Sequence, residues 1–245
     1  EKQFTLYCLV DRSAATADYV IEEQGPGRWS WPERYGCVGL VGAAKPGIRL
    51  LYDHDGTLYP QVLQRPVFEY LGKLKPGTSW AVERTKYAVA GSQTKKNRQC
   101  WRVELTNRFG RSGSIWVEKS TGLVVAASRR IVMGRGDEFQ LDMEIVSQKP
   151  VDSGRLASLK KPWTTLLDIQ KGLKRKPNTT RPELTAGQIG GVKAKIGRLS
   201  GEARSTPFAS LVAVIAKDIN GQSKRAASVE ELAKQRVGKP APRFK

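Results

Sequence analysis

The spacing of apolar residues changes near residue 150 from the period of a strand to the period of a helix. Before that point apolar and polar residues alternate, as they do over residues 101–106 and 139–145, and such alternation places successive side chains on opposite faces of a strand. Over residues 156–173, Leu, Ile and Trp recur at mostly three- or four-residue intervals, which is the spacing of one helix face. The pattern predicts an antiparallel β segment followed by a small helical segment, the α+β class.

Glycine-containing turns separate the expected strands of the β segment. The last four strands fall over residues 101–106, 114–118, 123–133 and 139–145. The connections between them are too short for anything but antiparallel neighbours, so these strands are expected to form a meander. A further hairpin is expected around Asp55-Gly56, between strands over 48–52 and 57–63, and one strand over 80–89. In all we expect roughly eight to ten strands, in a sheet with one covered face and one wet face.

Four helices are expected after residue 150. The first two follow apolar stripes over residues 156–173 and 183–199. Thr206-Pro207 supplies the cap and first turn of the third helix, and Gly221 is expected to end it. Ser228-Val229-Glu230-Glu231 matches a capping box, which predicts a short fourth helix.

Charge follows the same division, which breaker residues mark near 149–154. The chain of 245 residues has a net charge of +19, and residues 151–245 hold 20 basic and 7 acidic residues against 22 and 16 in residues 1–150. We therefore distinguish a β domain over 1–150 from a basic helical segment over 151–236. Its basic residues predict either contacts to polyanions, such as nucleic acid or anionic headgroups, or a solvated helix face.

The candidate polyanion contacts lie in the basic runs of the helical segment. They are Lys171, Lys174, Arg175, Lys176, Lys193, Lys195 and Arg198. No sequence signature of a nucleic-acid-binding module accompanies them, so nucleic acid is expected only as a weak, non-specific ligand.

No pattern of catalytic or metal-ligating residues is found in the chain. The single histidine, His54, lies in the expected turn of the hairpin, where turn chemistry explains its acidic neighbours. None of the three cysteines (Cys8, Cys37 and Cys100) belongs to a Cys-x-x-Cys pair. We expect no catalytic residue, no cofactor and no metal. The longest apolar run, over 208–216, is too short for a transmembrane helix.

The tryptophans of the β segment have two possible roles. They either pack in the core or line an apolar groove that holds a ligand. On a strand, Trp29 and Trp31 would share one face. The candidate ligand-binding residues are Trp29, Trp31, Trp80, Trp101 and Trp116.

The tail Val237-Gly238-Lys239-Pro240-Ala241-Pro242-Arg243-Phe244 resembles the opening of the redoxin branch of the thioredoxin fold, the peroxiredoxin and TlpA-like proteins. In that family the redox Cys-x-x-Cys or the peroxidatic cysteine follows tens of residues later, so no redox role passes to the cysteines of this chain. The resemblance implies that residues 237–245 begin a redoxin-like domain. This chain would then be the N-terminal part of a longer thiol-redox protein.

A second resemblance covers roughly residues 18–148. Arg28-Trp29-Ser30-Trp31-Pro32-Glu33-Arg34-Tyr35, residues 50–56 and the meander that ends at Ile145 are similar to the LolA/LolB/RseB type of periplasmic lipoprotein carrier. In that family a curved antiparallel sheet, an unclosed half-barrel, wraps helices and shelters acyl chains. The resemblance implies a half-barrel, a periplasmic or otherwise extracytoplasmic location and an apolar ligand. The family places helices within the β domain, whereas here the clear helices follow it.

These observations together favour a non-catalytic, extracytoplasmic binding or sensing module attached to a thiol-redox domain. Its ligand would be an acyl chain, a lipoprotein or another, acidic envelope component. The first alternative is a nucleic-acid or polyanion binder that acts through the basic helical segment. The second is the scaffold part of a thiol-disulfide oxidoreductase or of a peroxiredoxin-type antioxidant protein.

Overall fold

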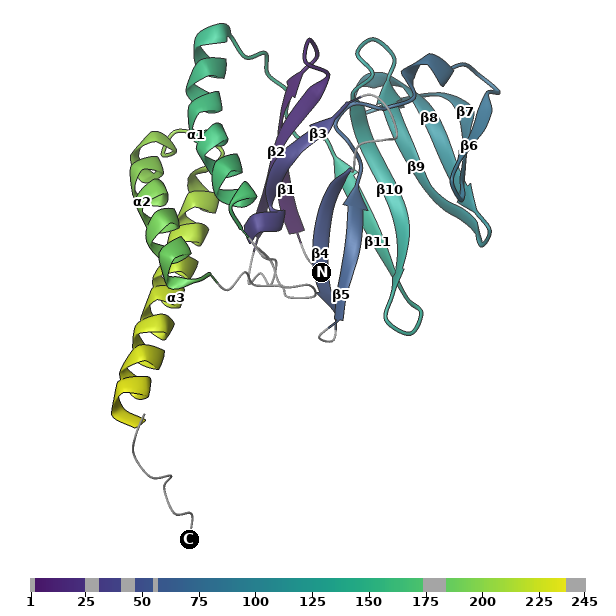
Figure 1. The fold of residues 1–245 in the computed structure, drawn as a ribbon. Coiled ribbons are helices and arrows are strands. Elements are labelled where there is room, and N and C mark those ends of the chain that lie inside the picture. The colour runs from purple at the N-terminus through teal and green to yellow at the C-terminus, as the bar shows by residue number, and fades with distance from the viewer. Residues whose placement is uncertain (1–2, 25–30, 41–46, 55–56, 174–183, 237–245) are drawn as a thin grey trace. The chain divides into compact units, whose positions relative to one another are not determined.

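The structure is a computed structural model that describes residues 3–24, 31–40, 47–54, 57–173 and 184–236. These residues form antiparallel sheets and helices (Figure 1), so the expected α+β class is confirmed. They fall into two compact units. The β unit comprises the described residues before Trp29 and those of Glu33–Pro150, and the helical unit comprises Trp31, Pro32 and the described residues from Val151 onwards.

A six-stranded antiparallel sheet forms the larger part of the β unit. Its strands are β6 (Ser79–Val82), β7 (Thr85–Lys95), β8 (Arg98–Asn107), β9 (Gly110–Glu118), β10 (Val124–Met133) and β11 (Asp137–Glu144). The order β11-β10-β9-β8-β7-β6 follows the chain (Figure 1), which confirms the expected meander. The expected single strand over 80–89 is wrong, because Glu83 adopts a φ of 52° and turns the chain between β6 and β7. Glycine or asparagine usually occupies such a position, and neither is present there to signal the turn.

Two smaller sheets complete the β unit. The strands β1 (Gln3–Asp11), β2 (Thr16–Gln24) and β3 (Tyr35–Gly39) pair in that order, and β4 (Ile48–His54) pairs with β5 (Thr57–Leu63). The expected hairpin is confirmed by the antiparallel pairing of His54 with Thr57. Its turn residues Asp55 and Gly56 lie outside the described residues. A short 3-10 helix, η2 (Leu71–Lys73), lies between β5 and β6.

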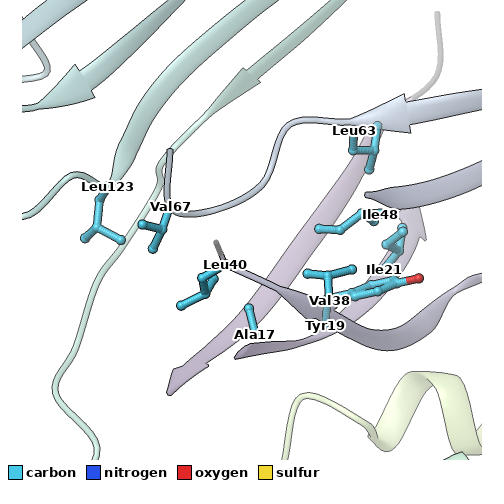
Figure 2. Packing of buried hydrophobic residues seen from close by; sticks show 9 residues of the cluster. All are labelled: Ala17, Tyr19, Ile21, Val38, Leu40, Ile48, Leu63, Val67 and Leu123. Carbon is cyan, nitrogen blue, oxygen red and sulfur yellow. The ribbon is translucent and has the colours of Figure 1, made fainter. Parts of the chain in front are cut away.

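Buried apolar side chains join the two smaller sheets in one core, shown in Figure 2. They are Ala17, Tyr19, Ile21, Val38, Leu40, Ile48, Leu63, Val67 and Leu123. Ala17, Tyr19 and Ile21 alternate along β2 and therefore share one face of the strand. Ile48 and Leu63, which are direct partners in the β4–β5 hairpin, pack into the same core.

The six-stranded sheet has one covered face and one polar face, as its alternating sequence predicts. Val103, Ile115 and Ala127 are buried on the covered face, in a core that includes Phe68 and Trp80. The residues between them along each strand point to the opposite face. That second face, which we call the polar face, carries mainly charged and hydroxyl side chains.

The helical unit contains α1 (Ser153–Lys171), α2 (Ala186–Glu202) and α3 (Ala209–Arg236) among its described residues. Asp152 caps α1 by accepting a hydrogen bond from the Arg155 N–H at 2.7 Å, and Thr185 with Gln188 forms a capping box at the start of α2. The helices bury one apolar face each, with Trp163, Leu166, Ile169, Ile189, Val192, Ile196, Leu199, Leu211, Ile215 and Ile219 in the interior. The first three expected helices are confirmed, but the expected end of the third helix at Gly221 is wrong.

The expected fourth helix is wrong, because α3 continues without a break through Gly221 and Ser228. The Ser228 hydroxyl donates to the Lys224 carbonyl at 3.0 Å, which is a mid-helix contact and not a cap. The glutamates that suggested a capping box are also good residues for an exposed helix interior, so the local sequence does not distinguish the two structures. Among the described residues, no helix has the length and hydropathy needed to cross a membrane.

Candidate functional site

The structure does not bring the candidate tryptophans together in one groove. Trp29 lies outside the described residues. Trp31 belongs to the helical unit and lies in a 3-10 helix, η1 (Trp31–Glu33), so the alternation of a strand does not apply to it. Its side chain is buried, and its indole N–H donates to Asp218 Oδ2 at 2.9 Å.

Trp80, Trp101 and Trp116 all lie on the six-stranded sheet, but on different faces. Trp80 is only 9% exposed and stacks on Tyr87 within the core, with ring centroids 5.3 Å apart. Trp101 is opposite Val117 on the covered face. Trp116 precedes Val117 in β9 and therefore points to the polar face.

A lysine ammonium lies over each of these three indole rings. Lys73 Nζ is 5.7 Å from the Trp80 ring centroid, Lys119 is 4.0 Å from that of Trp101, and Lys95 is 4.9 Å from that of Trp116. Cations over indole faces are attracted by the ring quadrupole. The rings therefore already stack against groups of the chain itself, which favours a packing role for these tryptophans.

The candidate polyanion contacts remain on the surface where they are described. Lys193, Lys195 and Arg198 are exposed on α2, and Lys171 at the end of α1 lies 3.5 Å from Asp168. Lys174, Arg175 and Lys176 lie outside the described residues.

A depression of about 280 Å³ lies on the polar face of the six-stranded sheet, and we call it the polar-face pocket. Its lining residues are Arg111, Ser112, Gly113, Ser114, Trp116, Ser128, Arg130 and Gln140. Strand register brings them together, because Ser114 of β9 is opposite Ser128 of β10, and Arg130 of β10 is opposite Gln140 of β11. Direct partners on neighbouring antiparallel strands project from the same face.

Two guanidinium groups give the polar-face pocket its charge. Arg111 donates to the Ser114 hydroxyl at 2.9 Å, and Arg130 reaches the Arg111 carbonyl oxygen at 3.4 Å. None of the described lining residues is acidic. The nearest carboxylates form loose ion pairs from outside the lining, with Glu104 at 3.6 Å from Arg111 and Glu138 at 3.4 Å from Arg130.

These ion pairs leave the arginines available for a ligand. The Arg111 side chain is 57% exposed and the Arg130 side chain 42%. Exposed pairs of this kind contribute little to stability, so their geometry is easily rearranged. A planar guanidinium offers donors that match a carboxylate or phosphate in two-point contact. The arrangement is suited to holding a small anionic group.

Gly113 is needed for the floor of the polar-face pocket. A Cβ atom at this position would lie 2.3 Å from the Ser128 carbonyl oxygen on the neighbouring strand. Only glycine allows the backbones of β9 and β10 to approach this closely.

Of these pocket residues, the sequence singled out only Trp116, as one of the candidate ligand-binding tryptophans. The sequence pattern that indicates the pocket residues is the alternation that makes one sheet face polar. Every second position belongs to this face, as Ser114 and Trp116 do on β9 and Ser128 and Arg130 do on β10. The relative register of β9 and β10 was not known, and without it the two pairs could not be placed beside each other.

Two of the three thiols, Cys8 and Cys100, offer little reactivity in this structure. No disulfide joins Cys8, Cys37 and Cys100. Burial raises the pKa of the Cys8 thiol to about 12 and also raises the pKa of Cys100, whereas a nucleophilic cysteine needs a lowered pKa. Cys37 is exposed. Among the described residues, no three His, Cys, Asp or Glu side chains gather in a group that could hold a metal ion.

Comparisons of the chain with family models, with curated proteins and with solved structures found no match. The function of the chain must therefore be inferred from the residues of its two units.

Proposed function

We propose that this chain is a non-catalytic, extracytoplasmic binding module of a longer thiol-redox protein, and that its β unit holds an anionic group in the polar-face pocket. The ligand would be an acidic component of the cell envelope, recognised through a carboxylate or a phosphate. The observation that carries the proposal is the pair Arg111 and Arg130, which line one depression without an acidic neighbour among its described lining residues.

The size and chemistry of the pocket support a small anion. Its volume of about 280 Å³ is at the lower end of small-molecule sites. The serine hydroxyls and the Gln140 side chain add hydrogen-bonding groups that can orient the bound group. A site of this openness would bind an isolated anion weakly, with a Kd on the order of 1 mM, and a larger ligand more tightly.

The wider context of the proposal comes from the sequence resemblances. We propose that the sheets of the β unit form the curved half-barrel of lipoprotein-carrier proteins, and that a redoxin-like domain begins at residues 237–245, which lie outside the described residues. The likeness to lipoprotein carriers would give the module an extracytoplasmic location, which also suits a TlpA-like partner domain. The position of the tryptophans favours an acidic envelope component over an acyl chain as the ligand of this unit, because Trp80 and Trp101 pack with core residues and a lysine lies over each of the three sheet indoles.

The test is an NMR titration of the full chain with inorganic phosphate and with citrate. We expect saturable shifts at Ser114, Ser128 and Trp116 Nε1. Arg111→Gln and Arg130→Gln should each weaken binding about tenfold, because each removes a charge-assisted donor. Arg135→Gln is the matched control, since Arg135 is exposed in the turn between β10 and β11, outside the pocket.

Equal losses in all three variants would mean that the anions respond to overall charge and would overturn the proposal. Shifts that map to α2 instead of β9 and β10 would do the same. A loss confined to the two pocket variants supports it.

Polyanion binding by the helical unit is a second candidate function. It is favoured by Lys193, Lys195 and Arg198, which are exposed on one helix and form no ion pair with a described residue. Several cations on one helix suit a phosphate backbone. Heparin affinity that falls on neutralising these three residues, with phosphate binding to the β unit unchanged, would separate this function from the first.

A further inference from the structure

A second cavity lies within the helical unit, between α2 and α3. It has a volume of about 190 Å³ and is lined by Lys193, Ile196, Gly197, Ser200, Ala216, Ile219 and Asn220. We call it the α2–α3 groove. It is independent of the polar-face pocket, because no residue is shared between the two.

The groove exists because small residues face each other across the helix pair. A Cβ atom at Gly197 would meet no other atom within 4 Å, so the space beside this residue is open. Ala216 contributes only a methyl group from α3. Larger side chains at these two positions would fill the volume that is now empty.

The floor and the rim of the groove differ in chemistry. Ile196 and Ile219 are 3% and 1% exposed and form an apolar floor. Lys193, Ser200 and Asn220 are exposed at the rim. On α2, Lys193 is one turn from Gly197, and the two lie on the same side of the helix.

The rim has positive charge that is not neutralised locally. Lys193 forms no ion pair with a described residue, and no described lining residue is acidic. The Ser200 hydroxyl is already used as a donor to the Ile196 carbonyl at 2.9 Å. Lys193 is therefore the group best placed to meet a negative charge at the mouth of the groove.

We propose that the α2–α3 groove binds a short aliphatic chain that ends in an anionic group. The hydrocarbon would lie on Ile196 and Ile219, beside Gly197, and the anion would meet Lys193. The volume is that of about six water molecules at roughly 30 Å³ each, and apolar cavities of somewhat smaller size hold a benzene molecule. A chain of roughly six carbon atoms therefore fits, and the charge selects a carboxylate over an amine.

The experiment uses sodium hexanoate as the probe, with hexylammonium and acetate for comparison, in NMR titrations of the full chain. Hexanoate should give saturable shifts at Gly197, Ala216 and Asn220. Hexylammonium should bind about tenfold more weakly because it is repelled by Lys193, and acetate should give no shifts there because it lacks the chain.

Four variants test whether hexanoate binds in the groove itself, and not through general charge or a change in helix stability. Gly197→Leu should reduce hexanoate binding at least about tenfold by filling the groove. Gly190→Leu is the matched control: Gly190 is on the same helix, has open space around it and does not line the groove. Ala216→Leu fills the groove from α3 and serves as a second test if the first variant does not fold. Lys193→Gln should weaken hexanoate but not hexanol.

Equal binding of hexanoate and hexylammonium would overturn the proposed selectivity. Binding that survives both Gly197→Leu and Ala216→Leu would overturn the site, and so would an equal loss in Gly190→Leu. These outcomes do not depend on phosphate binding to the β unit, so this proposal and the proposed function can fail separately.

Discussion

The indole N–H of Trp31 donates a hydrogen bond of 2.9 Å to the carboxylate of Asp218, although 187 positions separate the two residues in the sequence. A second hydrogen bond joins the neighbouring residue to the helices, because the Gln170 side-chain amide donates to the Pro32 carbonyl oxygen at 2.6 Å. The dipeptide Trp31-Pro32 from the first part of the chain is thus a structural element of the helical unit. A helical fragment that begins at residue 151 would lack both interactions.

The Trp31–Asp218 hydrogen bond should make a measurable contribution to the stability of the helical unit. Trp31→Phe keeps most of the buried ring but removes the donor, and we expect a loss of about 1–2 kcal/mol in the free energy of unfolding. Amide hydrogen exchange in α3 is the suitable measurement, because it reports on this unit even where the whole chain does not unfold in one step.

A double-mutant cycle tests whether the effect belongs to this pair. Asp218→Ala and Trp31→Phe should show a coupling of about 1 kcal/mol. Strictly additive losses would mean that the two side chains stabilise the helical unit independently, contrary to the hydrogen bond.

Gly113→Ala should destabilise the β unit and damage the polar-face pocket. Its new methyl group would lie 2.3 Å from the Ser128 carbonyl oxygen, and a backbone oxygen in a paired strand cannot move aside cheaply. We expect a loss of about 1–3 kcal/mol, measured by urea denaturation, together with weaker phosphate binding. Gly72→Ala is the control in the same unit, because a Cβ at that position meets nothing within 4 Å. A stability equal to that of the control would show that β9 and β10 tolerate separation at this point.

The elements that the sequence predicted well are those in which local pattern and tertiary packing agree. The strand around Val103 alternates because one face packs on a core and the other meets water. The helices around Trp163 and Ile215 have continuous apolar stripes for the same reason. Errors arose where a residue acts against its usual preference, as Glu83 does with a φ of 52°.

The candidate site was harder to predict because it depends on register. Arg111 and Arg130 are 19 residues apart, and their meeting on one face requires the pairing of β9 with β10 and an irregularity beside Thr106. A shift of one residue in either pairing would place them on opposite faces. Trp101 and Trp116 illustrate the same limit, because sequence spacing could not show that they point away from each other.

Alkaline pH should destabilise the β unit. Burial raises the pKa of Cys8 from 9.0 to about 12. Burial is also the main reason why the pKa of Tyr19 rises from 10.0 to about 12, and the nearby Cys8 and Cys37 thiols raise it further. The folded state favours the protonated forms of both groups. Their contribution to the stability of the β unit is therefore complete below pH 9 and is lost as pH rises toward 12. We expect the midpoint of urea unfolding to fall between pH 8.5 and pH 11.

The Cys8→Ala, Tyr19→Phe double variant tests this origin, because it cannot lose protons at either position. Its unfolding midpoint should decline less steeply over the same pH range. The same slope in wild type and variant would assign the alkaline transition to other groups, among them Tyr87, whose pKa burial also raises to about 12.

Binding of the chain to single-stranded DNA should be weak, unselective and strongly dependent on salt. The exposed cations Lys193, Lys195 and Arg198 can contact phosphates, which carry no sequence information. Selective binding to single strands also needs aromatic rings on which bases stack, and each described sheet tryptophan has a lysine of this chain over its ring. The measurement is fluorescence anisotropy with several oligonucleotides at two salt concentrations. Neutralising the three α2 cations should reduce the slope of log K against log salt concentration by about two to three. A preference for one sequence of about 100-fold or more near physiological salt would contradict this expectation, and it would make nucleic-acid recognition by the helical unit the leading function of the chain.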